Sequence, residues 1–294
     1  MKPFWLAGFL CLLPLVSHAA TMNAGGKERS YLTYRAPDLH LPAPTVIVLH
    51  GGGGDAQRMA HYNQFGTFAK THGILAVYPN AVDGFWNDGR KDERGATSDD
   101  VGFLEKLVRQ LIAKGLADPS HIYLTGMSNG GMMALRMACR APGLFAAVAV
   151  VAASQPEDVS CPAKPLPILM INGTDDGIVP YAGGPVGMGR VDRGRVIGHR
   201  KTLSLWEKVN GCSGPGQTKP LPDTASDGMT STETKFDCPA NAPVVGITVR
   251  GGGHSWPGSS QGLIARWLLG PVTQDFSAND AIWDFFSGHS AAPH

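Results

Sequence analysis

The sequence lacks several features that would point to a particular partner or metal. Beyond its N-terminus, no stretch is apolar enough to cross a membrane. The chain has no internal repeat, no block of like charge and no long Pro/Ser linker. It also has no C-x-x-C pair, a spacing typical of zinc sites, so we expect no bound metal.

Neither sign of charge is in excess. The chain has 25 basic and 24 acidic residues, and Lys2 is the only charged residue among residues 1–19. If residues 1–19 are removed, 24 basic residues balance 24 acidic ones. Such a balance gives no electrostatic attraction to nucleic acid or to an anionic membrane. We therefore expect neither partner for the mature chain.

The N-terminus has the pattern of an export signal. Lys2 precedes an apolar run from Phe4 to Val16, which is too short to span a bilayer comfortably. Ser17-His18-Ala19 then supplies the small-x-small pattern of a cleavage site. We predict a signal peptide over residues 1–19, a secreted or periplasmic protein, and a single domain over residues 20–294. An uncleaved anchor helix is the alternative.

Four of the five cysteines remain after the signal, which contains Cys11. An even number in an exported protein indicates two disulfides. Four cysteines allow three pairings. Cys139 with Cys161 and Cys212 with Cys238 close the shorter loops, and this is the pairing we predict.

The remaining chain alternates between short β-rich runs and helical patterns. Several of the runs are continuously apolar, as expected for parallel strands that are covered on both faces. This alternation predicts an α/β fold with a mostly parallel central sheet and helices on both faces. The expected strands are 31–34, 45–50, 74–78, 121–125, 145–151, 168–171 and 244–250, the expected helices begin near 98, 129, 201 and 278, and residues 182–195 and 211–241 are expected to be irregular.

Residues 126–130 read G-M-S-N-G and match the pattern G-x-S-x-G. They directly follow the apolar run 121–125 and directly open the helix expected from Asn129. This strand-turn-helix setting is the one that a nucleophile elbow requires. We therefore predict Ser128 as a catalytic nucleophile; the alternative is a plain Gly-rich turn with a capping serine.

A serine nucleophile needs a base and an acid that orients it. In this arrangement the histidine comes last in the chain, and His254 follows the run 244–250 in a Gly-rich loop. The acid is expected after the run 168–171, where Asp175 and Asp176 are adjacent. Their order in the chain does not separate the two aspartates.

An oxyanion hole is also required. Residues 50–54 read H-G-G-G-G, follow an expected strand, and are similar to the HGGG-type loop. We expect one N–H donor from Gly52, with Gly53 as its neighbour, and a second from Asn129. A phosphate loop is excluded because the G-K-[ST] ending is missing.

Taken in order, these motifs resemble those of the polyhydroxybutyrate depolymerase and feruloyl esterase-like family of α/β hydrolases. The resemblance is spread from about residue 30 to residue 287, so it covers essentially the whole mature chain. The segments 85–90 and 99–103 fit the same pattern. The segments that carry the resemblance are 49–52, 126–131, 173–176 and 252–258.

The resemblance implies further assignments. The family reads Gly-Thr-x-Asp, which makes Asp176 the acid. That motif is often preceded by histidine, where this chain has Asn172. The resemblance also implies Trp86 and Trp256 as substrate-binding residues, with core packing as the alternative for Trp86.

The resulting function is a secreted serine carboxylic ester hydrolase that works through an acyl-enzyme and needs no cofactor. The resemblance implies feruloyl, acetyl or hydroxyalkanoate esters as substrates. We expect small or oligomeric esters, because the chain ends soon after its last expected helix. The alternatives are a polyhydroxybutyrate depolymerase proper, a peptidase or acyltransferase with the same triad, and a catalytically silent polymer-binding protein.

Overall fold

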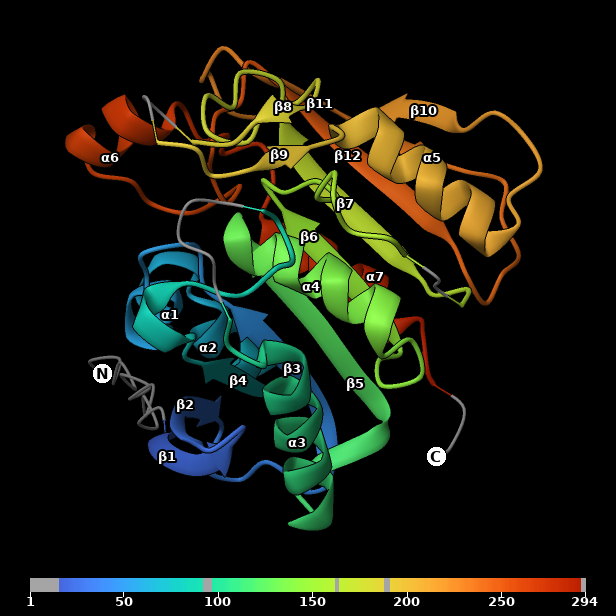
Figure 1. The fold of residues 1–294 in the computed structure, drawn as a ribbon. Helices are drawn as coiled ribbons and strands as arrows, with labels where there is room; N and C mark the ends of the chain where they lie inside the picture. The colour runs from blue at the N-terminus through green and yellow to red at the C-terminus, as the bar shows by residue number, and fades with distance from the viewer. Residues whose placement is uncertain (1–15, 92–96, 162–163, 188–190, 292–294) are drawn as a thin grey trace, which may run out of the picture.

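The computed structural model describes residues 16–91, 97–161, 164–187 and 191–291, so most of the predicted signal lies outside the described residues. Ten strands form one sheet in the order β1-β2-β4-β3-β5-β6-β7-β12-β11-β10 (Figure 1). A separate two-stranded ribbon pairs β8 with β9. The strands are β1 Val16–Ala24, β2 Lys27–Arg35, β3 Ala43–Leu49, β4 Leu75–Pro79, β5 Ala117–Met127, β6 Ala147–Val151, β7 Ile168–Gly173, β8 Gly184–Pro185, β9 Arg195–Val196, β10 Gln217–Pro220, β11 Thr230–Lys235 and β12 Val244–Arg250.

The centre of the sheet is parallel. β4, β3, β5, β6, β7 and β12 run in one direction, and antiparallel strands flank them on both sides. Every residue of β4 and β6 is buried, as expected for strands covered on both faces. This arrangement confirms the predicted α/β-hydrolase fold.

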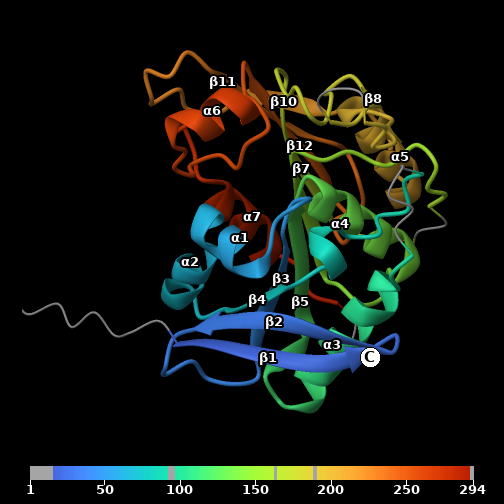
Figure 2. The same ribbon diagram turned by 60° about the vertical axis from the view of Figure 1, so that its left-hand side comes forward.

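Helices cover the two faces of the sheet in two groups, which Figure 2 shows on opposite sides of it. One group is α3, α4 and α5, whose apolar side chains pack with Ile47 and Leu49 of β3. The other is α1, α2 and α7, which pack with Val46 and Val48 of the same strand. Because side chains alternate along a strand, one short apolar run supplies both cores. The helices are α1 Ala56–Asn63, α2 Phe65–Thr71, α3 Asp100–Ala113, α4 Asn129–Arg140, α5 His199–Asn210, α6 Leu263–Leu269 and α7 Ala278–Ser287. No helix of the described ranges is long and apolar enough to cross a membrane.

The first strand, β1, overlaps the predicted cleavage site. It begins at Val16 and pairs with β2 along its whole length. Cleavage after Ala19 would leave Ala20 to Ala24 paired, including the buried side chains of Met22 and Ala24. The predicted signal peptide is therefore compatible with a shortened edge strand.

Both predicted disulfides are present. Cys139, in α4, bonds to Cys161 in the loop that follows β6. Cys212, just after α5, bonds to Cys238 just after β11. The first bond ties α4 to the loop beyond β6, and the second ties α5 to the antiparallel edge of the sheet.

A buried histidine lies between α5 and the sheet. The His199 Nδ1 atom is 3.0 Å from Asn172 Oδ1, and the ring stacks on Tyr181 with 4.9 Å between ring centroids. Burial and, to a smaller extent, the charge of neighbouring Arg200 lower the pKa of His199 from 6.5 to about 4. The ring is therefore neutral in the folded protein at neutral pH.

The stability of the protein is expected to fall as the pH drops from 6.5 towards 4. The folded-state pKa of His199 is below the unfolded value, so the unfolded chain binds more protons in this range. The contribution is present above pH 6.5 and amounts to on the order of 3 kcal/mol over the whole range. Urea unfolding of the native chain and of His199→Gln at several pH values would check this. An equally steep pH dependence in the variant would contradict it.

Candidate active site

The candidate residues lie at one edge of the sheet. His50 to Gly54 follow β3, Ser128 follows β5, Asp176 follows β7 and His254 follows β12. These four strands are parallel neighbours or near neighbours, so their carboxyl ends meet at the same edge. Ligands of open α/β sheets bind at this edge.

Ser128 occupies a strained turn between β5 and α4. Its φ is 56° and its ψ is −125°, a region that side-chain-bearing residues rarely adopt. The turn is held on one side by the Ser128 N–H, which donates to the Val151 carbonyl at 3.0 Å. On the other side, the Ser128 carbonyl accepts from Met132 N–H at 2.9 Å and so begins the helix. This is the backbone geometry of a nucleophile elbow.

The glycines around Ser128 are required by close backbone approach. A Cβ on Gly130 would lie 2.4 Å from the His50 carbonyl oxygen. A Cβ on Gly126 would lie 2.6 Å from the Gly130 carbonyl carbon, and one on Gly131 would lie 2.5 Å from Ala153 Cβ. The G-x-S-x-G pattern therefore allows β5, the start of α4 and the loop after β3 to pack against each other.

His254 and Asp176 form a buried hydrogen-bonded pair. The distance from His254 Nδ1 to Asp176 Oδ2 is 2.8 Å, and the two side chains are 5% and 1% exposed. The other oxygen of Asp176 accepts from the N–H groups of Ile178 and Val179, both at 2.8 Å. These bonds fix the carboxylate, and they leave His254 Nε2 as the nitrogen that can act on a substrate.

Asp175 has a different environment. Its side chain is exposed and accepts a hydrogen bond from the Thr174 hydroxyl at 2.7 Å. Its backbone N–H donates to the Gly252 carbonyl, which ties the loop after β7 to the loop after β12. The geometry therefore favours Asp176 as the orienting acid.

Ser128 and His254 line one pocket of about 490 Å³. In the part of the chain that the structure describes, the Ser128 hydroxyl has no hydrogen-bond partner. Hydrogen bonds of catalytic groups are often long without substrate and shorten when it binds. Much of the wall is apolar, and it includes Met59, Phe85, Ile178, Val186 and Leu269.

Gly52 and Asn129 line the same pocket as Ser128, and their backbone N–H groups are unpaired among the described residues. A Cβ on Gly52 would lie 3.5 Å from Asn129 Cβ, so these residues are adjacent. The N–H of Gly53 donates to the Gly84 carbonyl at 2.8 Å, and the N–H of Gly54 donates to the Gly51 carbonyl at 3.1 Å. No acceptor within the described residues takes the N–H of Gly52 or of Asn129. These two groups are the donors that the sequence predicted for an oxyanion hole.

His50 fixes the loop that carries Gly52. Its Nε2 accepts from the Ala81 N–H at 3.1 Å, so its Nδ1 carries the proton and donates to the Gly51 carbonyl at 2.8 Å. Burial lowers the pKa of His50, which favours this neutral form. His50 is therefore a structural support of the loop.

Asn129 is held by a network that sequence reasoning missed. Its carboxamide accepts from Trp86 N–H at 2.8 Å and donates to Asp88 at 2.7 Å. Asp88 is paired with Arg90, 2.7 Å away, and both side chains are nearly fully buried. Arg90 in turn reaches the Arg193 carbonyl at 2.7 Å. Segment 85–90 fitted the family pattern, but the pattern alone did not indicate that it supports the residue after the nucleophile.

The expected substrate contacts of the two tryptophans are wrong. Trp86 and Trp256 are 2% and 1% exposed and are not part of the pocket wall. The Trp86 indole N–H donates to the His50 carbonyl at 3.0 Å, and that of Trp256 donates to Asn279 at 2.9 Å. Trp86 and Trp256 therefore belong to the two cores on opposite faces of the sheet, where each indole N–H has a buried acceptor.

The described residues contain no cluster of three or more His, Cys, Asp or Glu side chains that could hold a metal ion. What the site does offer is a serine on a strained turn, a histidine oriented by a carboxylate, and two free backbone donors. This set of groups can attack a carbonyl carbon and stabilise the negative charge that develops on its oxygen.

Known proteins resemble this chain in sequence and in fold. The family described as Esterase PHB depolymerase matches residues 29–159. NocK of Nocardia uniformis subsp. tsuyamanensis, a protein named as an esterase, is 32% identical over 92% of this chain and 82% of its own length. Feruloyl esterase B of Piromyces equi is 29% identical over 72% of this chain, which spans only 40% of that protein.

The fold is similar to that of an acetyl xylan esterase from Aspergillus awamori. The TM-score is 0.64 over 92% of this chain and 99% of that one. The sequence identity is 16%, so this likeness concerns the fold.

Proposed function

The chain belongs to the polyhydroxybutyrate depolymerase and feruloyl esterase-like family of α/β hydrolases, and on that premise we propose that this esterase uses Ser128, His254 and Asp176 as its catalytic triad. The observation that carries the proposal is the strained turn at Ser128, which shares a pocket with the hydrogen-bonded pair His254–Asp176. Such strain persists where the surrounding structure imposes it, typically at functional sites.

In the first half of the reaction, the Ser128 oxygen bonds to the ester carbonyl carbon while His254 Nε2 takes the hydroxyl proton. The carbonyl oxygen becomes an oxyanion and accepts hydrogen bonds from the N–H groups of Gly52 and Asn129. Asp176 stabilises the imidazolium through Nδ1. The carbon–oxygen bond to the alcohol then breaks, His254 gives its proton to the leaving alkoxide, and an acyl-enzyme remains.

In the second half, water attacks the acyl-enzyme and His254 takes a proton from it. The tetrahedral intermediate uses the same two backbone donors. It collapses as Ser128 recovers its proton, and the carboxylic acid leaves. No step requires a cofactor.

The substrate that we propose is a feruloyl, acetyl or hydroxyalkanoate ester, small or oligomeric. A pocket of about 490 Å³ with an apolar wall has room for an aromatic or short aliphatic acyl group. Secretion or export to the periplasm is part of the same proposal. It is supported by the two disulfides, which persist in oxidising compartments.

Labelling with a fluorophosphonate probe tests this proposal. The probe is expected to attach to Ser128, as located by mass spectrometry of the digested protein, and to abolish hydrolysis of p-nitrophenyl acetate. Rates on matched feruloyl, acetyl and 3-hydroxybutyrate esters would then rank the acyl groups. Attachment to another serine, or full activity after labelling, would refute the assignment.

A further inference from the structure

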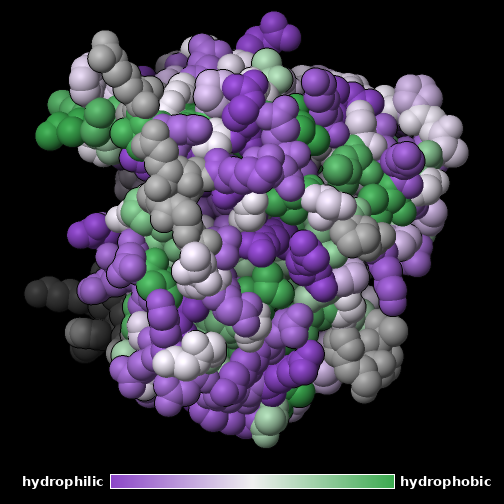
Figure 3. Space-filling view, in the orientation of Figure 1, coloured by the Kyte–Doolittle hydropathy of each residue, from purple (hydrophilic) through white to green (hydrophobic). Residues whose placement is uncertain are grey.

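Helix α6 exposes an unusual number of large apolar side chains. Leu263 is 87% exposed, Ile264 77%, Trp267 83% and Leu268 43%, and we refer to these four residues as the apolar tip. In the described part of the chain, Leu41 and Val191 alone expose comparable apolar side chains. No residue of α6 is buried. Figure 3 shows this tip as the green projection at the upper left of the molecule.

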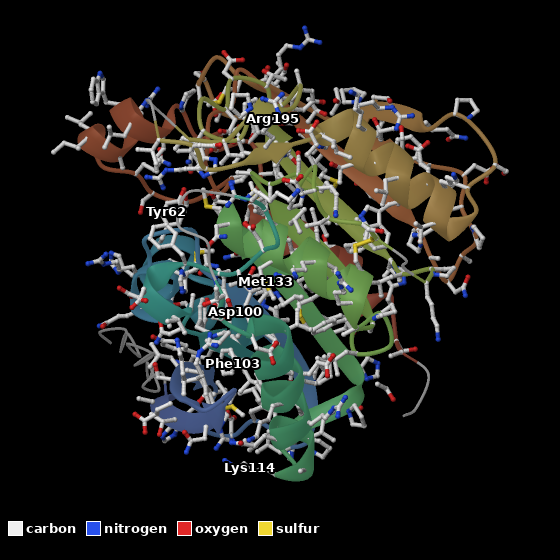
Figure 4. All side chains as sticks on the ribbon, in the orientation of Figure 1. Tyr62, Asp100, Phe103, Lys114, Met133 and Arg195 are labelled. Carbon is white, nitrogen blue, oxygen red and sulfur yellow. A yellow bond between two sulfur atoms is a disulfide. The ribbon has the colours of Figure 1, made fainter. Side chains whose placement is uncertain are left out.

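The tip is held at the mouth of the pocket. On its other side, α6 places Ala265 and Leu269 in the pocket wall. Its C-terminal end is anchored by the Leu269 carbonyl, which accepts from the His254 N–H at 2.6 Å. Before its N-terminal end, Gln261 donates to the hydroxyl of Tyr62 at 3.1 Å, and Figure 4 shows Tyr62 between α1 and α6. Because both ends are fixed, the tip stays outside the core.

The high exposure of the tip favours one kind of binding partner over another. Three of its side chains are more than three-quarters exposed, so water surrounds them on nearly all sides. A rigid flat surface would touch only the apex of such a projection. A fluid layer of acyl chains can close around every side chain, and it recovers the largest apolar area.

The segment that carries the tip has little charge of its own, and the nearby aspartates Asp227 and Asp275 are hydrogen-bonded to its C-terminal end at Thr273 and Gln274. From Gly251 to Gln274 the chain has no acidic residue, and Arg266 is its only charged residue. An exposed indole such as that of Trp267 also favours the boundary between headgroups and acyl chains. The overall charge balance, from which the sequence predicted no membrane partner, concerns electrostatic attraction and not apolar insertion.

We propose that the apolar tip of α6 inserts into the fluid acyl-chain region of a lipid layer, so that the pocket opens at the lipid surface. Binding to the layer does not depend on the catalytic residues. The delivery of esters from that layer to Ser128 rests on the proposed function. Ala265 and Leu269 of the same helix line the pocket that contains Ser128, so the tip and the nucleophile belong to one face of the molecule.

Tryptophan fluorescence of the mature chain from residue 20, carrying Ser128→Ala and mixed with phosphatidylcholine vesicles, tests the insertion. The mature chain is used because the predicted signal peptide contains an apolar run and a tryptophan of its own. From residue 20 onward the chain has five tryptophans. Trp86, Trp206 and Trp256 are at most 2% exposed and Trp283 is half-buried, whereas Trp267 is 83% exposed, so an environmental change is reported mainly by Trp267. We expect a blue shift on mixing and quenching by brominated phosphatidylcholine. Trp267→Phe should remove most of both signals.

A double variant, Leu263→Gln with Ile264→Gln, gives the quantitative test. Loss of two inserted side chains should weaken vesicle partitioning by about a hundredfold. Leu41→Gln is the matched control, because Leu41 is exposed at the opposite edge of the sheet, before β3, and should leave partitioning unchanged. Both changes, made in the chain with Ser128, should leave hydrolysis of soluble p-nitrophenyl acetate intact, which also reports correct folding.

Three results would overturn the proposal: no partitioning of the native chain, equal partitioning of the double variant, or adsorption to a solid polyester film without any to vesicles. Failure of the catalytic assignment would look different. It would appear as activity retained by Ser128→Ala on the soluble ester, whatever the vesicles do.

Discussion

Ser128→Ala is expected to lower kcat for a short p-nitrophenyl ester by about a millionfold, the loss typical when a serine nucleophile is removed. The reason is that no neighbouring side chain can replace the oxygen at the tip of the turn. The other components of the site remain, so slow hydrolysis above that in water is expected from the two backbone donors and from binding.

The fold of this variant should be unchanged. The strain at position 128 comes from its φ of 56°. Both alanine and serine carry a Cβ, so the backbone strain should be about the same in the variant. The Ser128 hydroxyl also supports no other described residue. Thermal unfolding and circular dichroism would verify this, and Ser213→Ala, the same change at an exposed serine, serves as the control. Substantial turnover by Ser128→Ala would remove Ser128 from the mechanism.

Asp176→Asn is expected to reduce kcat by about ten-thousandfold, whereas Asp175→Asn should change it by less than about threefold. Two backbone N–H groups, of Ile178 and Val179, donate to one oxygen of Asp176. In the asparagine variant the carbonyl oxygen keeps these bonds, and the amide NH₂ must face His254. It then donates to Nδ1, which forces the proton onto Nε2, and the ring can no longer accept from Ser128.

The comparison between the two aspartates is informative because they are adjacent and undergo the same chemical change. kcat and KM measured separately should show a loss in kcat at Asp176 with little change in KM. An equal loss at both positions, or a larger one at Asp175, would mean that the wrong acid has been assigned.

The parts of the fold predicted from sequence are those that apolar runs define. The central parallel strands were expected because runs such as 45–50 and 168–171 are almost continuously apolar in sequence. The polar strands β10 and β11 were missed because they lie in segment 211–241 and lack an apolar run. Every side chain of β10 is exposed, and only one side chain of β11 is buried. Helix α6 was missed for the opposite reason. Its seven residues are apolar except for Arg266, so they lack the periodicity that indicates a helix with one buried face.

Local sequence context predicted residue positions in the site better than side-chain directions. Ser128 and His254 could be placed because each follows a strand and is flanked by glycine. Trp86 and Trp256 lie in equally characteristic segments, but a segment near the pocket does not fix where its ring points, and both rings turn inward. The partner of Asp88 could not be found either, because Asn129 is 41 residues away in the chain.

Asn172, where the family often has a histidine, connects three elements of this chain. Its Oδ1 contacts Nδ1 of His199 in α5. Asn172 also donates to the Ala153 carbonyl at 3.1 Å, so the end of β7 is fixed to the loop after β6.

The tight packing of Gly126, Gly130 and the loop after β3 limits how this enzyme can be engineered. A single methyl group at Gly130 would push the His50 backbone away and displace the donor at Gly52 with it. Laboratory evolution of new substrate preferences should therefore accumulate changes in the outer loops, at positions such as Val186 or Ile178. The glycine framework should stay invariant in every active clone.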